Sequence, residues 1–153
     1  MLGPIIGVIG GSVADPPILE MARAVGRGIG KRGGILVTGG LGGVMEAASR
    51  GAKEEGGLVL GILPGSQARQ ANPWVDIPIV TGLSDARNTI IARTAAVLIA
   101  IDGSYGTLSE IAFALKFDKP VISLQSWQID PRIIEQTNAE EAVELAFQLA
   151  KAK

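Results

Sequence analysis

Six short runs of apolar residues constrain the fold more than any other feature of this sequence. They are continuously apolar and rich in β-branched residues, which is typical of strands buried on both faces of a parallel sheet. The intervals between them are too long for hairpin turns. The runs are Ile5–Ile9, Ile35–Val37, Leu58–Ile62, Ile77–Val80, Val97–Ile101 and Val121–Leu124.

Helical patterns fill the intervals between these predicted strands. Asp15 followed by Pro16 is typical of a helix start, and further helices are expected near 43–53, 84–94, 105–117 and 138–151. A short seventh strand is expected around 133–135. Alternating strands and helices imply right-handed crossovers. We therefore predict one domain over residues 1–153, a three-layer αβα Rossmann-like sandwich of the α/β class. Its mostly parallel sheet has six to seven strands in the order 3-2-1-4-5-6.

The residue types that are missing exclude several kinds of chemistry. The chain has no Cys and no His, so disulfides, the common zinc and iron–sulfur sites and mechanisms with a His base are ruled out, and we expect no metal site. The 14 basic and 15 acidic residues are spread along the chain, which argues against a nucleic-acid partner. No apolar run approaches the roughly 20 residues that span a bilayer, and the N-terminus does not resemble a signal peptide. We expect a cytoplasmic protein with no membrane partner.

Glycine is unusually frequent, with 21 of 153 residues, and three predicted strands run into Gly-rich turns that open helices. Glycine lets a ligand approach bare backbone N–H groups, and a helix N-terminus adds a partial positive charge. A single turn of this kind is more often only a tight connection. Three turns at the carboxyl edge of one sheet predict a phosphorylated ligand. Their residues are Gly10, Gly11 and Ser12, then Gly39, Gly40, Gly42 and Gly43, then Asp102, Gly103, Ser104, Tyr105, Gly106 and Thr107.

The usual nucleotide-binding signatures do not fit these turns. The chain has no G-x-x-x-x-G-K-[ST] motif, so ordinary P-loop chemistry is disfavoured. The first turn does not complete G-x-G-x-x-G, and the second predicted strand ends in Thr38 where a nicotinamide-binding fold carries an acidic residue. These departures argue against a dehydrogenase.

Several motifs together resemble the Lonely-Guy-type Rossmann superfamily, often mislabelled as lysine decarboxylases. Residues 38–48 resemble its Gly-rich second-strand motif, and residues 103–110 are similar to its G-G-x-G-T-x-x-E signature. Residues 61–64 resemble the end of its third strand, and Arg87-Asn88 the start of its fourth helix. The resemblance covers about residues 5–119 and is closest to the branch of molybdenum-cofactor carrier proteins. It implies a homodimer or homotetramer.

Two departures separate the chain from the phosphoribohydrolase branch of that superfamily, which releases a free base from nucleoside 5′-monophosphates. That branch has Pro-Gly-Gly where this chain has Asp102-Gly103-Ser104, and Arg-Lys where this chain has Arg87-Asn88. Both changes alter the charge near the anion site. A decarboxylase is not supported, because that chemistry needs a pyridoxal-phosphate lysine and no lysine lies in a convincing position.

Two charged residues are the candidates for chemistry. The planar fork of Arg87 suits a phosphate, and a cation at a helix start opposes the helix dipole, which favours a ligand contact. Glu110 corresponds to the carboxylate that the resemblance assigns to glycosidic cleavage, but Thr107-x-x-Glu110 is also a capping box. Met45 and Asn88 complete the predicted ligand-binding set, although Met45 fits the core as well. Arg93 is expected on a helix face.

The residues leave two functions open. The first is a binding protein for a phosphorylated nucleotide- or pterin-like molecule, such as the molybdenum cofactor or a nucleoside monophosphate. The second is a phosphoribohydrolase with Arg87 and Glu110 as its catalytic pair. The connection over residues 63–76 has no helical or strand periodicity, and it fits a ligand loop and a surface excursion equally well.

Overall fold

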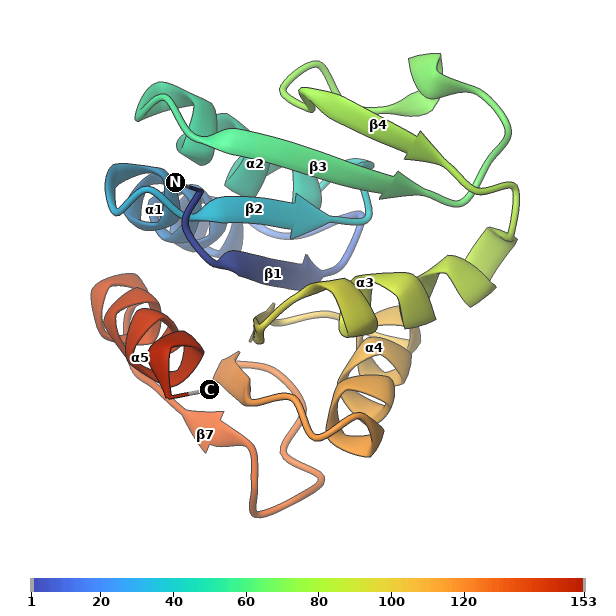
Figure 1. Ribbon diagram of the computed structural model, residues 1–153. Coiled ribbons are helices and arrows are strands. Elements are labelled where there is room, and N and C mark those ends of the chain that lie inside the picture. The colour runs from blue at the N-terminus through green and yellow to red at the C-terminus, as the bar shows by residue number, and fades with distance from the viewer. Residues whose placement is uncertain (1, 153) are drawn as a thin grey trace.

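The computed structural model describes residues 2–152, which form one seven-stranded parallel sheet and five α-helices (Figure 1). The strands are β1 (Ile5–Gly10), β2 (Ile35–Thr38), β3 (Leu58–Leu63), β4 (Ile77–Val80), β5 (Val97–Ile101), β6 (Val121–Leu124) and β7 (Ile134–Glu135). The helices are α1 (Pro16–Lys31), α2 (Val44–Glu54), α3 (Asn88–Thr94), α4 (Tyr105–Lys116) and α5 (Ala139–Lys151), with short 3-10 turns at Ala68–Gln70 and Ser84–Arg87. The predicted α/β sandwich is confirmed.

The strands follow the order β4-β3-β2-β1-β5-β6-β7, which differs from the expected order in the place of one strand. The fourth strand in sequence, β4, pairs with β3 at the edge, and β5 takes the place beside β1. Pro78 explains the edge position, because proline has no N–H group to donate within a central strand. The residues of β5 are fully buried, as a central strand requires, whereas Ile77, Ile79 and Val80 are 40–46% exposed.

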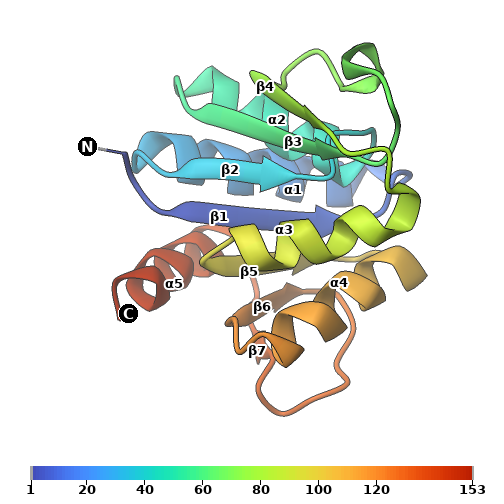
Figure 2. The same cartoon turned by 45° about the vertical axis from the view of Figure 1, so that its right-hand side comes forward.

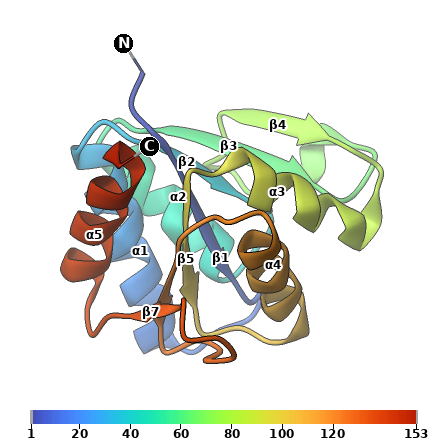
Figure 3. The same cartoon turned by 60° about the horizontal axis from the view of Figure 1, so that its bottom comes forward.

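Two hydrophobic cores fill the space on the two faces of the sheet. Helices α1, α2 and α5 cover one face, and α3 and α4 cover the other (Figures 2 and 3). Alternate residues of a strand serve the two cores: Ile6 and Val8 of β1 pack on the α1 side, and Ile9 packs on the α3 side. Within residues 2–152, no helix is both long enough and apolar enough to cross a membrane.

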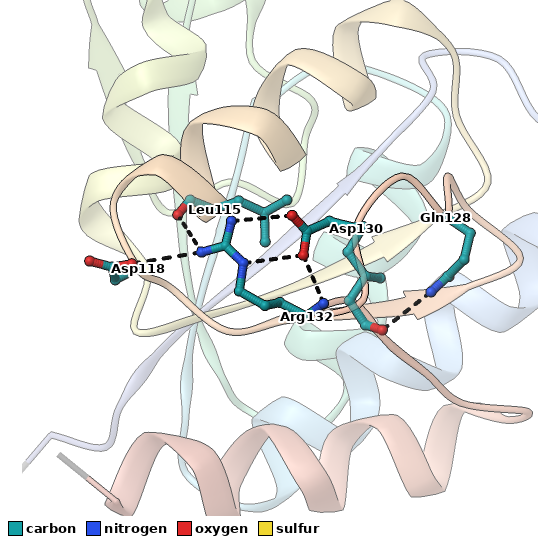
Figure 4. Close-up of polar contacts among 6 residues, drawn as sticks. Leu115, Asp118, Gln128, Asp130 and Arg132 are labelled. Carbon is teal, nitrogen blue, oxygen red and sulfur yellow. Dashed lines mark hydrogen bonds and ion pairs between the residues drawn. The ribbon is translucent and has the colours of Figure 1, made fainter.

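A cluster of polar contacts around Arg132 connects the segment between β6 and β7 to the end of α4 by hydrogen bonds (Figure 4). Arg132 donates from its backbone N and its Nε to Asp130 Oδ1, at 2.8 and 3.2 Å, and from Nη1 to the carbonyl oxygen of Leu115, at 3.2 Å. The hydrogen bonds from Arg132 lower the pKa of Asp130. This cluster anchors the last turn of α4, whereas the first turn of the same helix lies at the candidate site.

Candidate functional site

The strand order reverses beside β1, which lies between β2 and β5, and a pocket of about 200 Å³ opens at the carboxyl ends of these strands. Open α/β sheets bind their ligands at such a switch point. The pocket is lined by residues of the end of β1, of all three Gly-rich turns, of α2 and α4, and of the segment that opens α3. They are Ile9, Gly10, Gly11, Ser12, Leu41, Met45, Asp85, Arg87, Asn88, Ser104, Gly106, Thr107 and Glu110.

Most of the predicted site residues therefore lie together, although sequence reasoning missed three lining residues, Ile9, Leu41 and Asp85. Each of the three directly adjoins a predicted site segment or lies within two residues of one. The other predicted residues lie in the adjoining turns and do not line the pocket. They are Gly39, Gly40, Gly42, Gly43, Asp102, Gly103 and Tyr105.

Larger hollows of about 410 and 480 Å³ lie between α1 and α2 and between α1 and α5. Charged side chains on the helix surfaces line them, including Glu20 and Arg50 in the first and Arg27 and Lys31 in the second. The smaller pocket is the better candidate because buried charged residues and helix N-termini converge on it.

Several glycines of the predicted turns are explained by packing of the protein itself. Gly43 has a φ of +63°, and a Cβ atom there would lie 2.3 Å from the carbonyl oxygen of Gly11, so the first two turns pack directly against each other. At Gly103, with a φ of +99°, a Cβ would lie 2.2 Å from Thr107 Oγ1. Gly106 differs, since a Cβ there would meet no heavy atom within 4 Å among the neighbours that the structure describes. Gly106 is exposed, so it borders open space at the pocket.

Helix α4 begins at the pocket without a side-chain cap. Ser104 before α4 makes no side-chain capping bond, whereas Asn138 caps α5 by accepting from Glu141 N at 2.9 Å. At the start of α2, the N–H of Val44 is already used, since it donates to the carbonyl oxygen of Gly11 at 3.0 Å. The first N–H groups of a helix have no partner within the helix, and they carry the positive end of its dipole. The first turn of α4 thus presents donors to the pocket at Gly106 and Thr107.

Arg87 supplies a buried positive charge, with only 8% of the residue exposed. Its Nε donates to the carbonyl oxygen of Ile62 at 2.8 Å, its Nη2 to that of Gly39 at 3.3 Å, and its Nη1 to Asn88 Oδ1. Burial lowers the pKa of Arg87, while Glu110 and Asp85 oppose this shift. A guanidinium remains charged at neutral pH and has five N–H donors, so two stay available for a ligand.

Glu110 lines the same pocket and does not cap its helix. The interpretation as a capping box is wrong because α4 begins at Tyr105, which places Thr107 inside the first turn and Glu110 in the second. Glu110 is 7% exposed, and burial raises its pKa to about 8, while the positive charge of Arg87 opposes the shift. The carboxyl group is therefore mostly protonated at neutral pH, which leaves Asp85 as the other acidic residue that lines the pocket with Arg87.

The long connection before β4 supports the second Gly-rich turn from outside. Asn72 donates from its backbone N to the carbonyl oxygen of Gly40, at 2.8 Å, and from Nδ2 to that of Leu41, at 3.0 Å. The guanidinium carbon of Arg50 lies 5.6 Å from the centre of the Trp74 ring. Trp74 does not line the pocket. Sequence reasoning missed Asn72, whose partners are about 30 residues away.

Outside the pocket, the remaining candidate residues have simpler surroundings. Tyr105 is largely exposed beside the pocket, and its ring centre lies 6.0 Å from that of Trp127. Arg93 lies over the ring of Phe117 at 3.9 Å, which confirms its place on a helix face. No group of three or more His, Cys, Asp or Glu side chains suited to a metal ion occurs among residues 2–152.

The fold and the pocket at its switch point define a Rossmann-like α/β protein with a buried arginine among Gly-rich turns. Within that class the chain belongs to the SLOG cluster4 family, whose sequence profile matches residues 3–152. The family confirms the resemblance to the Lonely-Guy-type superfamily seen in the motifs.

Curated relatives and solved structures agree with this membership. The chain is 45% identical over 141 residues to an uncharacterized protein of Archaeoglobus fulgidus, covering 92% of this chain and 90% of that protein. It is 33% identical over 122 residues to a cytokinin riboside 5′-monophosphate phosphoribohydrolase of Mycobacterium marinum, covering 73% of this chain and 65% of that enzyme.

Two solved structures have nearly the same fold. One is the molybdenum cofactor binding protein of Rippkaea orientalis, with a TM-score of 0.92 and 40% identity over 97% of this chain and 98% of that one. The other is the molybdenum cofactor carrier protein of Chlamydomonas reinhardtii, with a TM-score of 0.89 and 39% identity over 99% of both chains.

Proposed function

We propose that this chain is a binding protein for a phosphorylated, nucleotide- or pterin-like small molecule, similar to the molybdenum cofactor carrier proteins. One observation carries the proposal: the buried, charged Arg87 faces the same small pocket as the uncapped first turn of α4. A guanidinium and free helix N–H groups are the donors that recognise phosphate. The similarity to two proteins that bind or carry the molybdenum cofactor supports the same proposed function.

The size of the pocket supports a ligand that is only partly enclosed. Pockets that bury most of a drug-sized ligand measure roughly 300–1,000 Å³, whereas this one measures about 200 Å³. We infer that the phosphate lies in the pocket and that the heterocycle extends over its rim.

We further propose that the protein is cytoplasmic and acts as a homo-oligomer, and that neither nucleic acid nor membrane is its partner.

Arg87 provides the direct test of this function. Replacing Arg87 with Ala removes the counter-charge, so the affinity for AMP should fall by about 1.5–3 kcal/mol, roughly tenfold to a hundredfold. Mass spectrometry of the purified protein would identify any ligand that it retains, and calorimetry would compare AMP binding by the two proteins. Equal affinity of both would contradict the proposal. Arg93→Ala is the matched control, because Arg93 lies on a helix face and should leave affinity unchanged.

The second candidate function is a phosphoribohydrolase, favoured by the 33% identity to the M. marinum enzyme and by the presence of Arg87 and Glu110 in one pocket. A carboxylate stabilises an oxocarbenium-like transition state only when it is ionised, and burial keeps Glu110 mostly protonated at neutral pH. We therefore expect binding without appreciable turnover. Release of adenine from AMP by the wild type that disappears in Glu110→Gln, with binding retained, would establish the enzyme instead.

A further inference from the structure

A chain of hydrogen bonds runs from Arg87 to the first turn of α4 through Asn88, which lines the pocket, and Ser109, which does not. Arg87 Nη1 donates to Asn88 Oδ1, and Asn88 Nδ2 donates to Ser109 Oγ at 3.1 Å. Ser109 Oγ then donates to the carbonyl oxygen of Gly106 at 2.7 Å. Asn88 begins α3 and Ser109 lies in α4, so the chain joins the starts of two helices across one side of the pocket.

The polarity of this chain permits one arrangement. A guanidinium has donors only, so the carbonyl end of the Asn88 amide must face Arg87 and its NH₂ end must face Ser109. The hydroxyl hydrogen of Ser109 is used on Gly106, which leaves an oxygen lone pair to accept from Asn88. Asn88 is only 4% exposed, so water does not compete freely for these groups. Each bond therefore fixes the direction of the next.

The neutrality of Asn88 is as important as its geometry. An amide oxygen holds the guanidinium without cancelling its charge, whereas a carboxylate at the same place would form an ion pair with it. The two carbonyl oxygens that also hold Arg87, from Ile62 and Gly39, are neutral as well. The three groups that accept hydrogen bonds from Arg87 thus orient the cation without forming an ion pair with it, while Asp85 acts on it only through the electrostatic field.

We propose that Asn88 and Ser109 are positioning residues of the anion site, which orient the Arg87 guanidinium toward the free N–H groups of α4 so that both act on one phosphate. This inference rests on the proposed function and adds to it a role that Asn88 and Ser109 exert through the orientation of Arg87. It predicts that anion affinity depends on the acceptor at residue 88 and on the hydroxyl at residue 109.

Four variants test the proposal by calorimetry with inorganic phosphate and with AMP. Asn88→Asp keeps the shape but adds a negative charge and loses the donor to Ser109, so affinity should fall at least tenfold. Ser109→Ala should lower affinity about threefold to tenfold, and Ser109→Thr, which retains the hydroxyl, should restore it. Asn138→Asp is the matched control, because it makes the same change in charge at the cap of α5, where Asp is an equally good cap. It should leave the affinity for phosphate and for AMP unchanged.

A second measurement reports on Arg87 without any ligand. In the wild type, NMR signals of the Arg87 Nη groups should be separate because the bond to Asn88 slows rotation of the guanidinium, and Ser109→Ala should merge or broaden them. Wild-type binding together with unchanged affinity in Asn88→Asp and Ser109→Ala would overturn this inference and leave the proposed function intact. Absence of wild-type binding to both phosphate and AMP would overturn the two together.

Discussion

At the scale of single residues, the pocket is defined by two ionisable groups whose surroundings act in opposite ways. Arg87 keeps its charge because a guanidinium stays protonated at neutral pH, whereas Glu110 loses its charge because little solvent reaches it. Protonation of Glu110 removes one negative charge from a pocket that also contains Arg87 and Asp85, and this favours an incoming anion. The pKa of Glu110 therefore couples ligand binding to pH.

The pH dependence of stability provides a test of the Glu110 environment. Between its ordinary pKa of 4.5 and the raised value of about 8, the folded protein holds a proton on Glu110 that the unfolded chain has released. The free energy of unfolding should therefore fall as pH rises through this interval, by at most about 1.4 kcal/mol per unit, and should level off above pH 8. The chain has no His to obscure the effect. Urea unfolding from pH 5 to 9 measures the slope.

The matched variant for this measurement is Glu110→Gln, which removes the titrating group. It should flatten the slope between pH 5 and 8 and keep the fold, and affinity for AMP should no longer decline above pH 8. A wild-type slope that the substitution leaves unchanged would show that Glu110 titrates near its ordinary value.

At the scale of elements, close approach of α1 and α2 explains part of the glycine content that is concentrated before residue 66. A Cβ at Gly26 of α1 would lie 1.9 Å from the carbonyl oxygen of Ala48, and one at Gly51 of α2 would lie 2.0 Å from that of Arg23. Each glycine lets its helix touch the backbone of the other. These two glycines are required by the packing of α1 against α2, whereas Gly106 has open space beside it.

Two Gly→Ala substitutions separate packing from ligand approach. Gly26→Ala should destabilise the protein by about 1–3 kcal/mol, because overpacking outweighs the helix propensity gained. Gly106→Ala should leave stability unchanged or raise it by up to about 1 kcal/mol, and should weaken AMP binding because the methyl group occupies space at the pocket. Urea unfolding and calorimetry measure the two effects. Loss of stability without loss of affinity at Gly106 would assign this glycine to packing as well.

At the scale of the whole molecule, exposed apolar side chains gather at one edge of the sheet. Ile77, Ile79 and Val80 of β4 and Leu83 after it are each at least 40% exposed. The apolar faces of α3 and α4 are also candidates for a contact between subunits, but they are largely used inside the core, where Ile91 and Ile111 are fully buried. The structure therefore adds the β4 edge as a second candidate contact surface.

We predict that the protein is at least a homodimer at micromolar concentration, which sedimentation velocity would measure. If the helix faces form the contact, Ala112→Lys on the exposed side of α4 should dissociate the assembly and Ile79→Lys should not. Dissociation by Ile79→Lys and not by Ala112→Lys would place the contact at the β4 edge. A wild-type monomer would contradict the prediction.

The sequence alone determined the elements and their class, because strands and helices depend on local patterns. The apolar runs predicted the six main strands to within one residue at every end, and Pro16 and the Gly-rich turns marked helix starts. Pro78 also carried the signal for an edge strand. The three Gly-rich turns indicated the carboxyl edge of the sheet as the candidate site, and the motifs indicated the superfamily, which the family match confirmed.

Only the tertiary structure decided what the site residues do. The carbonyl groups that orient Arg87 come from residues 25 and 48 positions away, and the partner of Asn88 is 21 positions away. The local pattern at Thr107 and Glu110 indicated a cap, but the observed start of α4 places Glu110 in the pocket and raises its pKa. Burial, charge state and hydrogen-bond direction depend on neighbours that the fold brings together from distant parts of the chain, and a local pattern does not contain them.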